Sequence, residues 1–218
     1  MPGRVICISH ATGSGGEEIG RLVAERLGFL HVDDEIVARA AARGGISPED
    51  VSDEERRKSL ATRILGTISE GGSSAMALGG ALPLVLEEGR SSSEIQALIR
   101  EAIEQTAARG DVVITAHAAS HALEPAANTL RVLVTASPGT RAQQVSDRAG
   151  VEIAKAERTV KAADAGRRDY LKRFYDVSEE LPTHYDLVVN TDRISVEEAA
   201  ALLADVAGAR STSLTTQT

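Results

Sequence analysis

The first 27 residues of the chain contain the pattern that most restricts its fold. Residues 5–8, Val-Ile-Cys-Ile, are an apolar, largely β-branched run of the kind that forms a buried parallel strand. A glycine-rich segment follows at residues 9–16, and Ile19, Leu22, Val23 and Leu27 then recur at the spacing of an amphipathic helix. The pattern predicts a strand, a glycine turn and a helix, which is the first unit of a parallel α/β sheet.

The same alternation returns later in the chain. Short apolar runs predict strands at residues 29–32, 112–115, 131–135 and 187–190. Helical spacing predicts helices at 95–103, 138–148 and 152–173, and Ser195 with Glu198 forms a capping box for a last helix. Continuous apolar strands separated by helices indicate an α/β fold, with a parallel sheet covered by helices on both faces.

Residues 35–92 differ from this pattern. Few large apolar residues occur there, and Gly-Gly pairs at 71–72 and 79–80 interrupt the helical spacing. We therefore expect one domain over residues 1–208 with a helical insert at about 35–92. Residues 209–218 are polar and without periodicity, so we expect a disordered tail.

Composition excludes several classes of protein. The 218 residues have a net charge of −8 and only 2% aromatics, which argues against a nucleic-acid binder. The single cysteine, Cys7, excludes an internal disulfide framework. No apolar run approaches the length of about 20 residues that spans a bilayer, and the N-terminal apolar stretch is too short for a signal peptide. We expect a cytoplasmic protein without membrane partners, and a homodimer stays open.

The glycine-rich segment is the strongest candidate for a binding site. Ligands of open α/β sheets bind beyond the carboxyl ends of the strands, where this segment should lie. Glycines let main-chain N–H groups approach an anion, and the following helix adds the positive end of its dipole. These features predict a phosphate cradle made of Gly13, Ser14, Gly15 and Gly16. The simpler alternative is a tight turn without a ligand.

Two nucleotide motifs compete for this segment. The dinucleotide pattern G-x-G-x-x-G finds Gly13, Gly15 and a later acid, Asp33, but Glu18 stands at its third glycine. The P-loop pattern G-x-x-x-x-G-K-S/T fits the loop length better, with His10 at the first glycine and Gly15 at the last. It places Gly16 where the phosphate-binding lysine belongs and Glu17 at the magnesium-binding hydroxyl.

The N-terminal segment reads V-I-C-I-S-H-A-T-G-S-G-G-E-E-I-G-R-L-V-A-E-R-L-G, and H-V-D-D-E-I follows shortly after it. This segment resembles the cytidylate-kinase-like branch of the P-loop nucleoside monophosphate kinases. That branch commonly shows G-S-G-G without the lysine. The resemblance continues through V-V-I-T-A-H-A, R-V-L-V-T-A-S-P-G-T-R, D-A-G-R-R-D-Y and Y-D-L-V-V-N-T-D-R-I-S-V-E-E-A. It covers most of the chain, with residues 44–92 weakly matched.

The resemblance implies a kinase that moves the γ-phosphoryl group of ATP, with Mg²⁺, to a nucleoside monophosphate or a similar small acceptor. The P-loop would hold the donor phosphates, and the insert would hold the acceptor. Because the P-loop lysine is missing, we add the hypothesis that Glu17 or Glu18 binds magnesium directly. Asp33 would face the acceptor phosphate or a magnesium-bound water. His117 stands where the branch has an acceptor-contacting arginine. A lid at about 141–176 would supply Arg141, Asp164, Arg167 and Arg168.

The charge of the lid agrees with this role. Residues 155–173 hold seven basic and three acidic residues in an otherwise acidic chain, which suggests an anionic ligand. The alternative is a solvated helix with ion pairs four residues apart, Asp164 with Arg168 and Asp169 with Arg173. Two other functions stay open: a nucleotide-binding protein that lost turnover together with the lysine, and a dinucleotide-dependent dehydrogenase.

Overall fold

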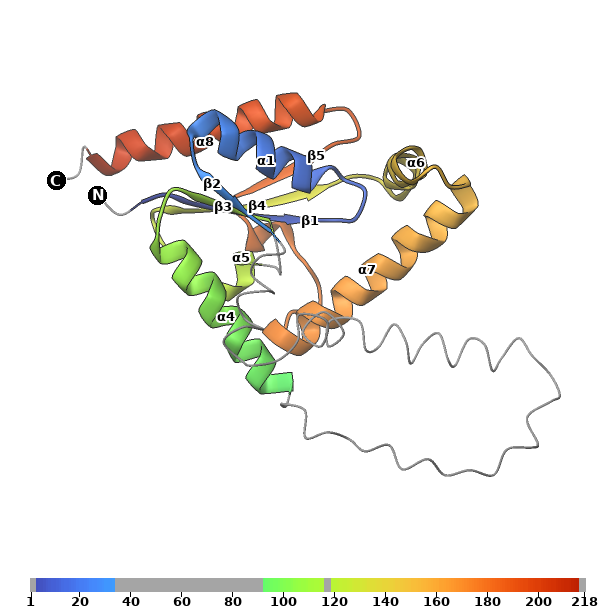
Figure 1. Ribbon diagram of the computed structural model, residues 1–218, viewed down its shortest axis with the longest axis horizontal. Helices are drawn as coiled ribbons and strands as arrows, with labels where there is room; N and C mark the ends of the chain where they lie inside the picture. The colour runs from blue at the N-terminus through green and yellow to red at the C-terminus, as the bar shows by residue number, and fades with distance from the viewer. Residues whose placement is uncertain (1–2, 34–91, 116–118, 216–218) are drawn as a thin grey trace.

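The structure is a computed structural model that describes residues 3–33, 92–115 and 119–215. Within these ranges it is a parallel sheet between two layers of helices (Figure 1). The predicted insert at 35–92 lies outside the described residues, apart from residue 92, and so does His117.

The described strands form one five-stranded sheet in the order β2-β3-β1-β4-β5, and all of their pairings are parallel. The strands are β1 (Val5–His10), β2 (Leu30–Val32), β3 (Val112–Ile114), β4 (Thr129–Thr135) and β5 (Leu187–Asn190). In the dinucleotide-binding fold β2 lies directly beside β1. Here β3 lies between them, which contradicts the dehydrogenase alternative.

Alternation along β1 sends side chains to two cores. Ile6 and Ile8 pack on one face, under α1 (Gly16–Leu27) and α8 (Val196–Thr215), while Val5 and Cys7 pack on the other face. That second face is covered by α4 (Ser92–Ala108) and α5 (Ala119–Ala122) (Figure 1). Burial raises the pKa of the Cys7 thiol to about 12, so Cys7 is an unreactive core residue, as predicted.

A helical hairpin lies beyond the carboxyl ends of the strands (Figure 1). It consists of α6 (Pro138–Ala149) and α7 (Ile153–Tyr175), joined at Gly150, whose left-handed φ of 61° ends α6. Ala142, Ala156 and Val160 form its small core. A short 3₁₀ helix, η1 (Pro182–His184), leads back from α7 to β5. The hairpin therefore faces the sheet edge at which β1 ends.

The last helix starts as expected but ends later than expected. The last helix begins after its predicted capping box, in which the Ser195 N–H donates to Glu198 Oε2 at 2.9 Å and the Glu198 N–H donates to Ser195 Oγ at 3.1 Å. However, α8 continues to Thr215, so most of the expected disordered tail is helical. The short helix α5 was not predicted, because four residues are too few to show a period. In the described part of the chain no helix is long and apolar enough to cross a membrane.

Candidate functional site

The glycine loop is held in place by main-chain and hydroxyl bonds. The Ala11 N–H donates to the Val134 carbonyl at 3.1 Å, and the Ser14 N–H closes a turn on the Ala11 carbonyl at 3.0 Å. The buried Ser14 hydroxyl donates to the Val134 carbonyl at 3.1 Å. Thr191, after β5, donates its hydroxyl to the Ser14 carbonyl at 2.9 Å. The loop is therefore anchored to β4 and to the segment that follows β5.

Two glycines give the loop its shape. Gly13 and Gly15 have left-handed φ values of 82° and 81°, which side chains rarely adopt. A Cβ on Gly13 would also lie 2.5 Å from the Arg141 carbonyl oxygen. Gly15 caps α1 without a side-chain hydrogen bond, so the first-turn N–H groups of that helix keep their capacity for an external acceptor. This geometry suits an anion at the positive end of α1.

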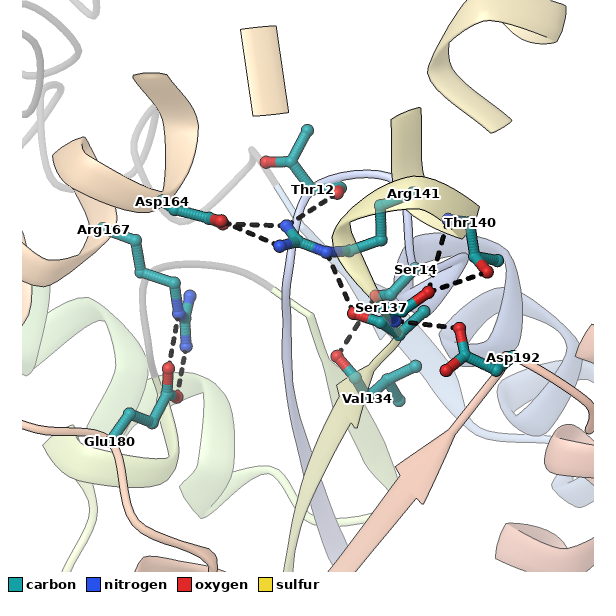
Figure 2. A network of polar contacts seen from close by, with 11 residues as sticks. Thr12, Ser14, Val134, Ser137, Thr140, Arg141, Asp164, Arg167, Glu180 and Asp192 are labelled. Carbon is teal, nitrogen blue, oxygen red and sulfur yellow. Dashed lines mark hydrogen bonds and ion pairs between the residues drawn. The ribbon is translucent and has the colours of Figure 1, made fainter. Parts of the chain in front are cut away.

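Arg141 connects three parts of the site, as Figure 2 shows. Its side chain is 6% exposed and forms two 2.8 Å hydrogen bonds with the carboxylate of Asp164 on α7. It also donates to the Thr12 carbonyl in the glycine loop at 3.3 Å and to the Ala136 carbonyl at 3.1 Å. The structure thus brings together two predicted lid residues, Arg141 and Asp164, and ties α7 to the glycine loop through them.

Arg167 has a different partner. Its guanidinium binds the Glu180 carboxylate through two hydrogen bonds of 2.8 and 2.7 Å (Figure 2). Glu180 also accepts from the Tyr185 hydroxyl, which contacts His121 Nε2 at 3.1 Å. Burial alone would raise the pKa of Glu180, but Arg167, Tyr185 and His121 outweigh it and lower that pKa. In this structure Arg167 therefore neutralises a partly buried carboxylate.

The remaining charged residues of the lid test the two interpretations of this segment, an anion-binding surface and a solvated helix with internal ion pairs. Asp169 pairs with Arg173 at 3.3 Å, four residues away, as the ion-pair alternative predicted. The other pair was wrong, because Asp164 binds Arg141 and not Arg168. Arg168 is exposed, and no ion pair to it occurs among the described residues. Of the lid arginines predicted for the site, Arg168 is thus the one with a solvated guanidinium.

The predicted acidic residues are not assembled into one cluster. Glu18 forms surface ion pairs with Arg21, at 2.7 Å, and these lower the pKa of Glu18. Glu17 is exposed in the first turn of α1. Asp33 is exposed after β2, two strands from β1 in the sheet and therefore roughly 10 Å to its side. Among the described residues no group of three or more His, Cys, Asp or Glu side chains could hold a metal ion.

Sequence reasoning missed the residues that support the loop from β5 and α6. Asp192 accepts from the Ser137 N–H at 2.8 Å, and that hydrogen bond is the first cause of the lowered pKa of Asp192. Ser137 caps α6 and contacts the Thr140 hydroxyl at 3.0 Å. A serine before Pro138 is a recognisable helix start. The hydrogen bonds of Thr191 to Ser14 and of Asp192 to Ser137 join residues far apart in the chain, so no short sequence pattern predicts them.

Known proteins share this architecture. The model of the cytidylate kinase-like family matches residues 5–193. The cytidylate kinase of Aeropyrum pernix is 29% identical over 93% of this chain and 97% of its own length. The cytidylate kinases of Methanopyrus kandleri and Pyrobaculum arsenaticum are 29% and 31% identical over half of this chain, and these matches span only 59% and 62% of the two enzymes.

Solved structures agree on the fold. An uncharacterized protein from Eubacterium ventriosum aligns with a TM-score of 0.64 at 15% identity, over 94% of this chain and 98% of its own. Shikimate kinase from Bacteroides thetaiotaomicron aligns with a TM-score of 0.50 at 15% identity, over 93% of this chain and 97% of its own. These likenesses confirm the α/β fold of P-loop, nucleoside monophosphate kinase-like proteins. The chain belongs to the cytidylate kinase-like family.

Proposed function

We propose that this protein is an ATP-dependent kinase whose acceptor is a nucleoside monophosphate, with a cytidylate as the first candidate. The observation that supports it most is the glycine loop. Gly13 and Gly15 are left-handed in the loop after β1, and this loop leads into the N-terminus of α1, where the N-cap Gly15 offers no side-chain hydrogen bond. The family match includes the whole unit. The main-chain N–H groups of Gly13, Ser14, Gly15 and Gly16 would bind the donor phosphates.

The residues present suit a magnesium ion that arrives with the nucleotide. Mg²⁺ in kinases is held mainly by water and substrate phosphates, with one or two carboxylates from the protein. The exposed Glu17, in the first turn of α1, is the carboxylate we propose for it. Bound there, the ion would neutralise charge on the β- and γ-phosphates.

The α6–α7 hairpin supplies the cationic side chains. Arg168 is exposed on α7 and has no ion pair within the described ranges, so its guanidinium would be able to bind a phosphate bidentately. Arg167 would first have to exchange Glu180 for phosphate, whereas Arg141 keeps α7 attached to the loop through Asp164 and Thr12. Asp33 and His117 stay proposals for the acceptor side.

The deciding experiment is a coupled ADP-release screen with Mg-ATP and CMP, dCMP, UMP, AMP or GMP as acceptor. We expect turnover that is fastest with a cytidylate. Arg168→Gln should lower kcat by about 10²-fold, the cost of one preorganised charge donor. Lys172→Gln, an exposed residue one turn further along α7, is the matched control and should leave kcat unchanged.

The alternative is a non-catalytic nucleotide-binding protein, and the lysine missing at position 16 favours it. Calorimetric binding of ATP without ADP release for any acceptor would support that alternative. A protein that binds no nucleotide at all would refute both functions.

A further inference from the structure

The two unusual residues of the P-loop pattern contact each other. His10 stands at the first glycine of the pattern, and Gly16 stands at the lysine. A Cβ built on Gly16 would lie 2.2 Å from His10 Cβ, 2.5 Å from His10 Cγ and 3.1 Å from His10 Cδ2. The His10 side chain therefore fills the space through which a lysine at position 16 would leave the helix.

The histidine at position 10 and the glycine at position 16, which both differ from the P-loop pattern, are therefore structurally linked. A side chain at position 16 cannot coexist with the histidine at position 10, because both would need the same volume. Gly16 is also the first residue of α1, so the imidazole lies at the positive end of that helix, beside the cradle of N–H groups. An imidazole can carry a positive charge near neutral pH.

Charges from two helices surround His10. Burial lowers the pKa of the His10 imidazole. The carboxylate of Glu17 on α1 opposes this, the guanidinium of Arg167 on α7 adds to it, and the main chain of Ala11 and Thr115 opposes it. The net effect is a lowered pKa, which favours the neutral ring as long as no anionic ligand is bound. A polyphosphate in the loop would favour the protonated ring, since an opposite charge within a few ångströms stabilises the charged form.

We propose that His10 contacts the donor phosphates in place of the P-loop lysine, and that position 16 is glycine because this histidine requires the space. The inference rests on the proposed function, because it presumes a nucleotide in the glycine loop. It implies that nucleotide binding takes one proton from solvent onto the imidazole, so that ATP binds more tightly at low pH. A lysine in the same place would bind phosphate without that dependence.

The first test is titration calorimetry of the full chain with Mg-ATP between pH 6 and 8, in buffers of different ionisation enthalpy. We expect proton uptake on binding and an affinity that falls by up to about tenfold per pH unit. His10→Asn should remove the uptake and weaken binding about tenfold or more, the size of one charge-assisted hydrogen bond. His121→Gln is the control, since His121 is another partly buried histidine with a lowered pKa, and it should change neither property.

The second test exchanges the two residues. Gly16→Lys alone should lower the Tm and not improve binding, because its Cβ overlaps His10. The double variant His10→Gly/Gly16→Lys should bind Mg-ATP at least as tightly as the wild type, without proton uptake and with a flat pH profile. This variant decides the question even if His10→Asn fails to fold.

The outcomes separate this inference from the proposed function. If wild-type protein binds Mg-ATP but His10→Asn keeps the same affinity and proton uptake, the role of His10 is refuted and the nucleotide site stands. If Gly16→Lys is tolerated beside His10 without loss of stability, the steric argument is wrong. If the wild type binds no nucleotide, both proposals fall together.

Discussion

Removal of the Asp164 carboxylate should lower the stability of the fold, because Asp164 and Arg141 connect α7 to the glycine loop. The Arg141 side chain is 6% exposed, and it gives Asp164 two hydrogen bonds of 2.8 Å. In Asp164→Ala the guanidinium stays buried but loses this partner, which costs about 3–5 kcal/mol in a fully buried pair. Because Asp164 is 30% exposed, water can replace part of the interaction, and we expect a loss of about 2–3 kcal/mol.

For a chain of this length each kcal/mol shifts the Tm by about 2–4 °C, so Asp164→Ala should melt about 4–12 °C below the wild type. Differential scanning calorimetry measures this directly. The control is Arg21→Ala, which removes exposed pairs with Glu18 and Glu25 and should leave the Tm unchanged. A Tm of Asp164→Ala within about 2 °C of the wild type would show that the pair contributes little to stability.

Two further predictions concern Glu180 and the loop. The lowered pKa of Glu180 means that its pairing with Arg167 stabilises the fold above the ordinary carboxyl value of 4.5 and loses this effect as the pH falls through the lower folded pKa. The Tm of Glu180→Gln should therefore be lower than that of the wild type above about pH 5 and approach it in acid, and equal gaps at pH 3 and pH 7 would contradict this. Gly13→Ala should lose about 1–2 kcal/mol from its left-handed backbone, with the overlap on Arg141 adding to this, and urea unfolding measures the change. Gly139→Ala, which has open space around it, should cost nothing, so equal effects of the two substitutions would refute the argument.

Local patterns predicted most of the secondary structure. Gly28 ends α1 with a left-handed φ of 69°, and the Ser195–Glu198 capping box begins α8 as expected. These signals act over three to five residues, so they can be read without knowledge of the fold. The position of the glycine loop at the end of β1 was predictable for the same reason, since strand, loop and helix are contiguous.

The sequence did not predict which partners Arg141, Asp164 and Arg167 of the lid would bind. Arg168 lies four residues after Asp164, so helical spacing alone made it the expected partner. Arg141 belongs to another helix and comes near Asp164 only through the fold, yet the structure pairs Asp164 with Arg141. Arg167 was expected to serve phosphate, and it binds Glu180 beyond the end of α7. Such choices depend on burial and on the angle between helices, which no short window of sequence contains.

The amino-acid sequence by itself determined the strands, the helices and the glycine turn after β1, because periodicity, caps and glycine conformations are set by neighbouring residues. Only the tertiary structure decided that β3 lies between β1 and β2, that Arg141 ties α7 to Thr12, and that His10 occupies the volume left by Gly16. The physical reason is that steric exclusion and charge pairing act through space, and the chain brings these atoms together only once both faces of the sheet are packed.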